Sequence, residues 1–239
     1  MNLPILLRLL FAHILADFAL QPDFLSQGKS QRGYKGLISL LIHSSIHAAL
    51  AYALVAQWNN WVIPLIIFFT HFGMDWIKVH KMQQTTKSFL IDQAVHIAVI
   101  LIIWLIFFTN GFTIEQFPIE WNSPKVWIIA IAYLLVLQPS SILLGLFIAK
   151  WTPNELKEKS LPNAGKWIGY LERLLILTFI LSENIEGVGF LLAAKSIFRF
   201  GELNKPGEIR TTEYVLIGTL ASFSIAIIIG LLTLHQINP

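Results

Sequence analysis

Long runs of hydrophobic residues, separated by short polar segments, occupy most of the chain. Most of these runs approach or exceed the roughly 20 residues that a helix needs to cross about 30 Å of hydrocarbon. The pattern therefore predicts an all-α polytopic membrane protein with about seven to eight transmembrane helices. The segment at 187–200 is short, so it either crosses at a tilt or re-enters. The predicted spans are 3–20, 37–57, 61–80, 89–109, 125–148, 167–182, 187–200 and 213–235.

The composition supports a membrane protein and excludes several kinds of chemistry. Of the 239 residues, 55% are hydrophobic and only 13% are charged, whereas soluble domains carry about 25% charged residues. The absence of cysteine excludes disulfides, iron–sulfur clusters and thiol catalysis. In a membrane protein, the net charge of +3 indicates basic cytoplasmic loops and no nucleic-acid binding.

Charge in the connecting segments predicts how the chain is oriented. The loops after the first, third, fifth and seventh spans are basic, and the opposite loops are acidic or uncharged. By the positive-inside rule the basic loops are cytoplasmic, and both termini lie outside. Arg8 does not fit this pattern, because it lies in the outer half of the first span with no evident partner. The basic loop residues are Lys29, Arg32, Lys35, Lys81, Lys87, Lys150, Lys157, Lys159, Lys166, Lys205 and Arg210.

Two segments of the first half repeat in the same order. "FAHILADF" at 11–18 resembles "FTHFGMDW" at 69–76, and "LIHSSIHAAL" at 41–50 resembles "LIDQAVHIAV" at 90–99. Repeats with the same membrane orientation are related by an axis along the membrane normal. We therefore expect residues 1–57 and 61–109 to be tandem hairpins that form a four-helix bundle within residues 1–110. Residues 121–239 would form C-terminal membrane helices with basic cytoplasmic loops.

Each of the first four spans carries one pair of ionisable residues four positions apart. Such residues share one face of a helix. The order of each pair alternates with the direction of its helix, which places all four pairs at one depth. Four histidines would form a deeper layer, and the other four residues would lie nearer the cytoplasm. The pairs are His13/Asp17, His43/His47, His71/Asp75 and Asp92/His96.

These eight side chains predict a metal site. One aspartate in mid-bilayer costs on the order of 3 kcal/mol, and no lysine or arginine of these spans is evidently placed to neutralise three of them. Either the carboxylates take up protons or a cation lies among them. A single intramembrane histidine usually makes a hydrogen bond between helices, but four pairs in register favour a metal. Nitrogen and oxygen donors without sulfur suit zinc foremost, or manganese or iron, and eight ligands suffice for two ions.

A second polar group lies in the C-terminal half. Glu172 and Arg173 fall in the sixth span, and Lys195 and Arg199 fall in the seventh, four positions apart. We expect Lys195 either to pair with Glu172 or, with Arg173, to hold an anionic group such as a phosphate. Arg199 would bind the same substrate or simply extend to the membrane interface.

Several of these motifs resemble a known family. They are "AHILADFALQ", "LIHSSIHAAL", "HFGMDWIK", "FLIDQAVH", "IGYLERLLIL" and "GFLLAAKSIFRFGE". Over nearly the whole chain the sequence resembles the bacterial membrane family catalogued as domain of unknown function 3307, which implies the bacterial cytoplasmic membrane and no particular activity. The H-x-x-x-D pairs are also similar to those of membrane-bound metal-dependent hydrolases, although that group's arginine-rich and Thr-His-Ser elements are absent.

The leading functional hypothesis is a metal-dependent hydrolase that acts on a lipid or lipid-phosphate at the cytoplasmic leaflet. A metal-activated water would be the nucleophile, with Asp17 or Asp92 as general base. A dinuclear iron lipid oxidase or hydroxylase, a cation or proton transporter, and a structural or assembly role remain as alternatives. The expected partner is membrane lipid, while a second copy of the chain or a soluble cytoplasmic protein stays open.

Overall fold

The computed structural model describes residues 2–31, 33–83, 85–108, 122–152, 163–200 and 209–238. The regular secondary structure of these residues is entirely helical and includes no β-strand, which confirms the all-α prediction. The chain divides into two compact units, Met1–Ile131 and Ala132–Pro239. The functional division into 1–110 and 121–239 remains a prediction.

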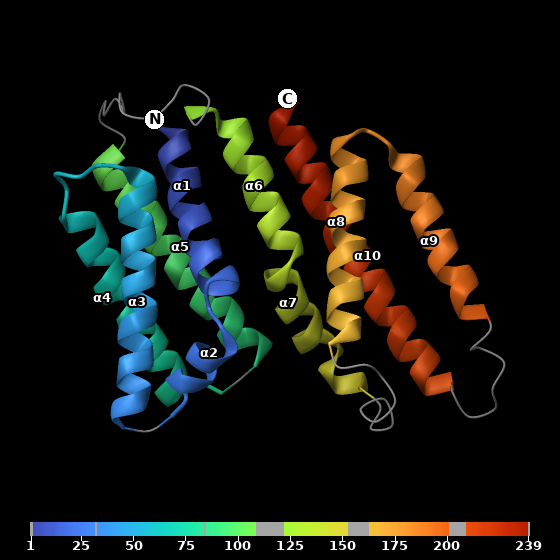
Figure 1. The fold of residues 1–239 in the computed structure, drawn as a ribbon, viewed down its shortest axis with the longest axis horizontal. Coiled ribbons are helices and arrows are strands. Elements are labelled where there is room, and N and C mark those ends of the chain that lie inside the picture. Colours follow the sequence, from blue (N-terminus) through green and yellow to red (C-terminus); the bar gives the residue numbers. More distant parts are fainter. Residues whose placement is uncertain are drawn as a thin grey trace. The chain divides into compact units, whose positions relative to one another are not determined.

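The first unit contains a bundle of four long helices (Figure 1). Helix α1 packs against α3 and α5, and α4 packs against the same two helices, so the four form a closed ring. Successive long helices run in opposite directions, as expected for two tandem hairpins (Figure 1). Their bounds are α1 Leu3–Ile14, α3 Tyr34–Val55, α4 Val62–Lys81 and α5 Thr86–Phe108.

The interior of this bundle is apolar along one half of its length and polar along the other. The apolar half is a cluster of buried side chains from all four helices, including Ile5, Val55, Ile63 and Phe108. The eight paired His and Asp residues lie next to this apolar cluster. They follow its residues in the sequence of the first and third long helices and precede them in α3 and α5. The apolar half therefore supplies the packing that holds the polar half in register.

The end of α1 is not a regular α-helix. Residues Leu15–Ala19 form a π-helical turn, η1, in which the amide of Leu20 donates to the carbonyl of Leu15 at 2.9 Å. Such turns are uncommon and are frequent at functional sites, and this one carries Asp17. The chain then bends by 90° into the short helix α2, Asp23–Lys29, which packs against α3.

Gly36, in the first turn of α3, is required by a close approach of the backbone. A Cβ at this position would lie only 2.0 Å from the carbonyl oxygen of Gln31. We expect Gly36→Ala to displace the segment that links α2 to α3 and to lower the free energy of unfolding by roughly 1–3 kcal/mol. Gly73→Ala in α4 is the matched control, because a Cβ there meets nothing within 4 Å. Thermal unfolding of the two variants in detergent measures the difference, and equal midpoints would contradict the expectation.

The second unit is built on α8, which packs against α7, α9 and α10 (Figure 1). Helix α6 gives way to α7 at Leu137, two residues before Pro139, and the boundary between the two units falls within α6. The bounds are α6 Pro124–Val136, α7 Gln138–Ile148, the 3₁₀ turn η3 Ala149–Trp151, α8 Ala164–Leu181, α9 Ile185–Phe200 and α10 Ile209–Ile237.

Five helical segments in the described residues are long and apolar enough to cross a membrane, or six if α1–η1 and α2 together form one bent span. This is consistent with a multi-pass membrane protein. Helices α8 and α9 form at two further predicted spans, but α8 carries three charged residues and α9 has only 16 residues. The five segments are Tyr34–Val55, Val62–Lys81, Thr86–Phe108, Pro124–Trp151 and Arg210–Ile237.

Arg8 has partners that the sequence did not reveal. Its side chain is completely buried, its Nη2 donates to Asn122 Oδ1 at 2.6 Å, and its guanidinium lies 5.6 Å from the centre of the Trp127 ring. An amide oxygen and an aromatic face both stabilise a buried cation. Arg8 therefore connects α1 to the beginning of α6 within the first unit.

Candidate metal centre

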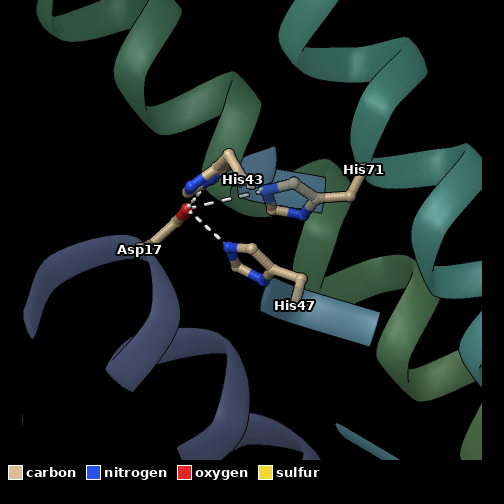
Figure 2. Close-up of side chains that lie close together, drawn as sticks. All are labelled: Asp17, His43, His47 and His71. Carbon is tan, nitrogen blue, oxygen red and sulfur yellow. Dashed lines mark hydrogen bonds and ion pairs between the residues drawn. The ribbon is translucent and has the colours of Figure 1, made fainter. Parts of the chain in front are cut away.

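Three imidazoles converge on the carboxylate of Asp17 (Figure 2). Oδ1 of Asp17 lies 3.0 Å from Nε2 of His43, 3.1 Å from Nε2 of His47 and 3.6 Å from Nε2 of His71. The π-helical turn of α1 supplies the aspartate, two successive turns of α3 supply His43 and His47, and α4 supplies His71. All three histidines are buried.

The four donor atoms lie within 4.8 Å of one another, which is close to the spacing around a bound cation. Ligand atoms about 2.0–2.2 Å from a tetrahedral zinc lie roughly 3.3–3.6 Å from one another. Nε2 of His43 is 3.1 Å from Nε2 of His71 as well as 3.0 Å from Asp17 Oδ1. An imidazole nitrogen carries either a proton or a lone pair, so His43 cannot serve both contacts well. A cation among the groups would accept a lone pair from each of them.

A second candidate group shares one residue with the first. Donor atoms of His71, Asp75 and His96 all lie within 4.8 Å of one another, and all three residues are buried. The imidazole of His71 stacks on His47 at a centroid distance of 3.6 Å and on His96 at 3.9 Å. His71 belongs to both groups, and its Nε2 lies 3.6 Å from Asp17 Oδ1 and 3.9 Å from Asp75 Oδ2. This one nitrogen cannot ligate an ion in each group at the same time.

Comparison with known proteins places the bundle in a family. Residues 5–123 match the family model described as "Protein of unknown function (DUF3307)". Over these residues the chain belongs to the DUF3307 family. No curated protein and no solved structure matches the chain. The match ends before the C-terminal motifs, so it is shorter than the nearly full-length resemblance expected from the sequence.

The DUF3307 region contains all eight residues that were predicted to share one site, and the structure brings all eight together. The ring of His13 lies 5.3–5.8 Å from the rings of His47, His71 and His96. Nε2 of His13 is 3.6 Å from Asp17 Oδ2, and Oδ1 of Asp92 is 3.4 Å from Nε2 of His96. His13 and Asp92 thus border the two candidate groups without belonging to either.

Two lysines neutralise carboxylates of the DUF3307 bundle, although the sequence showed no lysine or arginine of the spans evidently placed to do so. Nζ of Lys29 donates to Oδ2 of Asp75 at 2.6 Å, and both side chains are buried. Nζ of Lys78 donates to Oδ2 of Asp92 at 2.6 Å. Lys29 had been expected in a cytoplasmic loop, but the 90° bend before α2 returns it to the bundle. Asp17 is left with imidazoles as its ion-pair partners among the described residues.

Gln93 is a further polar residue of the site. Its Nε2 donates to Asp17 Oδ2 at 2.9 Å, and its Oε1 is 3.3 Å from Nε2 of His13. These contacts hold the second oxygen of Asp17 away from the imidazoles that face Oδ1. Gln93 follows Asp92 directly on α5, so its spacing alone gave no sign that it reaches α1.

A small cavity borders the site on the side of the apolar cluster. Its volume is about 20 Å³, and its polar lining consists of His13, His47, His71, His96 and Thr70. A space of this size holds about one water molecule when polar partners surround it. The site therefore has room for one small ligand beside its imidazoles.

The residues predicted to bind substrate lie in the second unit. Lys195 pairs with Glu172 at 2.6 Å, which is one of the two arrangements expected from the sequence. Arg173 is buried, and its guanidinium donates to the carbonyls of Val136 and Leu137 at the α6–α7 break and to the hydroxyls of two serines, Ser141 and Ser222. The side chain of Arg199 lies outside the described residues. The role of these four residues in binding substrate remains a prediction.

Proposed function

We propose that the bundle holds a catalytic divalent metal ion and that the protein is a membrane hydrolase acting on a lipid or lipid-phosphate at the cytoplasmic leaflet. The observation that carries the proposal is the convergence of three buried imidazoles on Oδ1 of Asp17. Three histidines with one carboxylate make a donor set that suits zinc, manganese or iron(II). The location in the bacterial cytoplasmic membrane, with both termini outside, belongs to the same proposal.

The charges of the site favour one ion over two. Three aspartates and two lysines give a net charge of −1 when the histidines are neutral. One divalent ion changes this to +1, whereas two would leave +3 in a buried environment where unbalanced charge is costly. Both candidate groups include His71, which also favours one ion over two. We therefore propose one tightly held ion bound by Asp17, His43, His47 and His71.

The neighbouring residues supply the other requirements of hydrolysis. A metal of this kind lowers the pKa of a water and polarises the scissile phosphoryl or acyl oxygen. The cavity beside the imidazoles provides space for that water. Asp92 lies against His96, which lines the cavity, so this pair is the candidate to take the proton of water. In phosphoester hydrolysis the water oxygen bonds to phosphorus, the bond from phosphorus to the lipid oxygen breaks, and the lipid alcohol leaves with a proton.

The alternatives differ in what the bundle should contain. A cation or proton transporter needs a polar route through both halves of the membrane, but buried side chains such as Leu9, Ile67, Ile100 and Phe108 fill the other half of the bundle. A dinuclear iron oxidase needs two ions, which the two lysine–aspartate pairs disfavour. The hydrolase hypothesis requires only one metal ion and one water molecule.

The test is hydrolysis by purified protein in lipid nanodiscs. We expect release of inorganic phosphate from a lipid phosphate monoester such as phosphatidic acid, loss of this activity after chelation, and recovery when zinc or manganese is returned. His47→Ala should reduce the rate by at least about 100-fold, since it removes a metal ligand. His80→Ala is the matched control, because His80 is an exposed histidine at the end of α4, away from the site.

Other results would select an alternative. A coloured preparation with about two iron ions per chain would favour the oxidase. Metal or proton flux into liposomes that Asp75→Asn abolishes, without any hydrolysis, would favour the transporter. A preparation without stoichiometric metal, in which His47→Ala and His80→Ala behave alike, would contradict the proposed function as a whole.

A further inference from the structure

A large cavity in the second unit has no part in the proposed metal chemistry. Its volume is about 800 Å³, which is within the usual range for small-molecule sites. We propose that this cavity binds an anionic, phosphate-bearing membrane lipid. The proposal goes beyond the hydrolase, because it concerns a second site that is built entirely within residues 132–239.

The charged residues of the cavity wall give it a positive balance. Lys166, Arg173 and Lys195 line the cavity with a single acid, Glu172, so these four residues carry a net charge of +2. Lys195 remains partly exposed although it is paired, and Lys166 is exposed. Ammonium groups on a cavity wall attract phosphate, which accepts charge-assisted hydrogen bonds.

Arg173 gives the cavity a fixed polar end. The residue is 2% exposed, and the contacts of its guanidinium with Ser141 Oγ at 2.6 Å and Ser222 Oγ at 3.1 Å hold two cavity-lining hydroxyls in place. Gln138 is held in the same wall by a hydrogen bond from the hydroxyl of Tyr170, at 2.7 Å. A buried cation with positioned hydroxyls is a built polar site and not a chance grouping of surface lysines.

The remaining wall is apolar and suits a hydrocarbon chain. Ile142, Leu144, Ile148, Ile168 and Val215 line it, and glycines of α7, α8 and α10 leave the space between them open. A site with a cationic end and an apolar wall distinguishes an amphiphile from free phosphate, which would use only the cationic end.

The position of the cavity along the helices indicates which leaflet would supply the lipid. It is lined by the first half of α8, the first half of α10, Lys195 of α9 and the whole of α7, which lies in the second half of the Pro124–Trp151 segment. The segments that follow α7 and α9 contain Lys157, Lys159 and Lys205. By the positive-inside rule these segments are cytoplasmic, so the lipid would come from the cytoplasmic leaflet.

The experiment is a binding titration of the full-length protein in a neutral detergent, followed by native mass spectrometry. The probes are dioctanoyl phosphatidylglycerol, dioctanoyl phosphatidylcholine and inorganic phosphate. We expect phosphatidylglycerol to bind at least about fivefold more tightly than phosphatidylcholine, and phosphate alone to bind undetectably. Equal binding of the two lipids, or binding of phosphate alone, would overturn the proposal.

Charge variants distinguish lipid binding in the cavity from a purely structural role of the Lys195–Glu172 ion pair. Lys195→Gln should weaken phosphatidylglycerol binding several-fold, whereas Glu172→Gln should strengthen it, because the two changes move the wall charge in opposite directions. Lys150→Gln, an exposed lysine of the same unit that does not line the cavity, should leave the affinity unchanged. If Lys195→Gln and Glu172→Gln change the affinity in the same direction, or neither changes it, the ion pair is structural only and the proposal fails.

A steric variant and the metal-site variant complete the test. A Cβ at Gly145 meets nothing within 4 Å and the residue lines the cavity, so Gly145→Leu should fill the space and abolish lipid binding without unfolding the protein. Asp17→Asn should bind phosphatidylglycerol as the wild-type protein does. Unchanged binding to Gly145→Leu, or its loss in Asp17→Asn, would contradict a site confined to the second unit.

Discussion

Asp17→Asn is expected to lower the metal content of the purified protein from about one ion per chain to near zero. The change preserves the size of the side chain but removes the charge and the anionic oxygen on which His43, His47 and His71 converge. Anionic carboxylate is the form that ligates a metal, and affinity depends on it. Elemental analysis after purification in detergent, with added zinc and then exhaustive dialysis, measures the loss.

Two variants control this result. His80→Ala removes an exposed histidine and should leave the metal content unchanged. His13→Ala should reduce metal affinity less than Asp17→Asn, because His13 borders the four-residue group without belonging to it. If Asp17→Asn retains a full ion, or if His13→Ala loses as much metal as Asp17→Asn, then the assignment of ligands is wrong.

Lys29→Met is expected to lower the free energy of unfolding by about 3–5 kcal/mol, which corresponds to a fall of roughly 6–20 °C in the midpoint of thermal unfolding. Lys29 is 8% exposed and Asp75 is 4% exposed, and they form an ion pair of 2.6 Å. Removing the lysine leaves the aspartate buried without its cation, and this cost exceeds the loss of a surface ion pair, which is about 0–1 kcal/mol. Thermal unfolding monitored by circular dichroism measures the change.

The double variant Lys29→Met/Asp75→Asn should recover most of the lost stability. Replacing both members of a buried pair avoids the unpaired charge, and such replacements are often neutral. Lys35→Met, an exposed lysine at the beginning of α3, should change the midpoint very little. A midpoint for Lys29→Met equal to that of Lys35→Met would show that the Lys29–Asp75 pair does not stabilise the bundle.

Much of the candidate site could be predicted because helix geometry connects sequence spacing to direction. His43 and His47 are four residues apart, so they lie on one face of α3 whatever surrounds the helix. The reversed order of His71/Asp75 and Asp92/His96 compensates for the opposite directions of α4 and α5. For these residues the periodic pattern and the hairpin order together were enough to predict that they meet.

Other contacts of the first unit join residues far apart in the sequence. Lys29 reaches Asp75 only because the chain bends by 90° before α2, and Asn122 reaches Arg8 across 114 positions. No local pattern encodes these approaches. Sequence spacing also gave no sign of the π-helical turn at 15–19, which depends on the backbone bond from Leu20 to Leu15.

The sequence by itself determined an all-helical protein with membrane-length helices and the set of eight ionisable residues that meet in the bundle, because hydrophobicity and helical periodicity are local properties of the chain. Only the tertiary structure decided which of those residues face one another closely enough to share an ion, and which carboxylates are already neutralised by lysine. The physical reason is distance: electrostatic and metal–ligand interactions act over a few ångströms, and the packing of four helices and a bent fifth sets those separations.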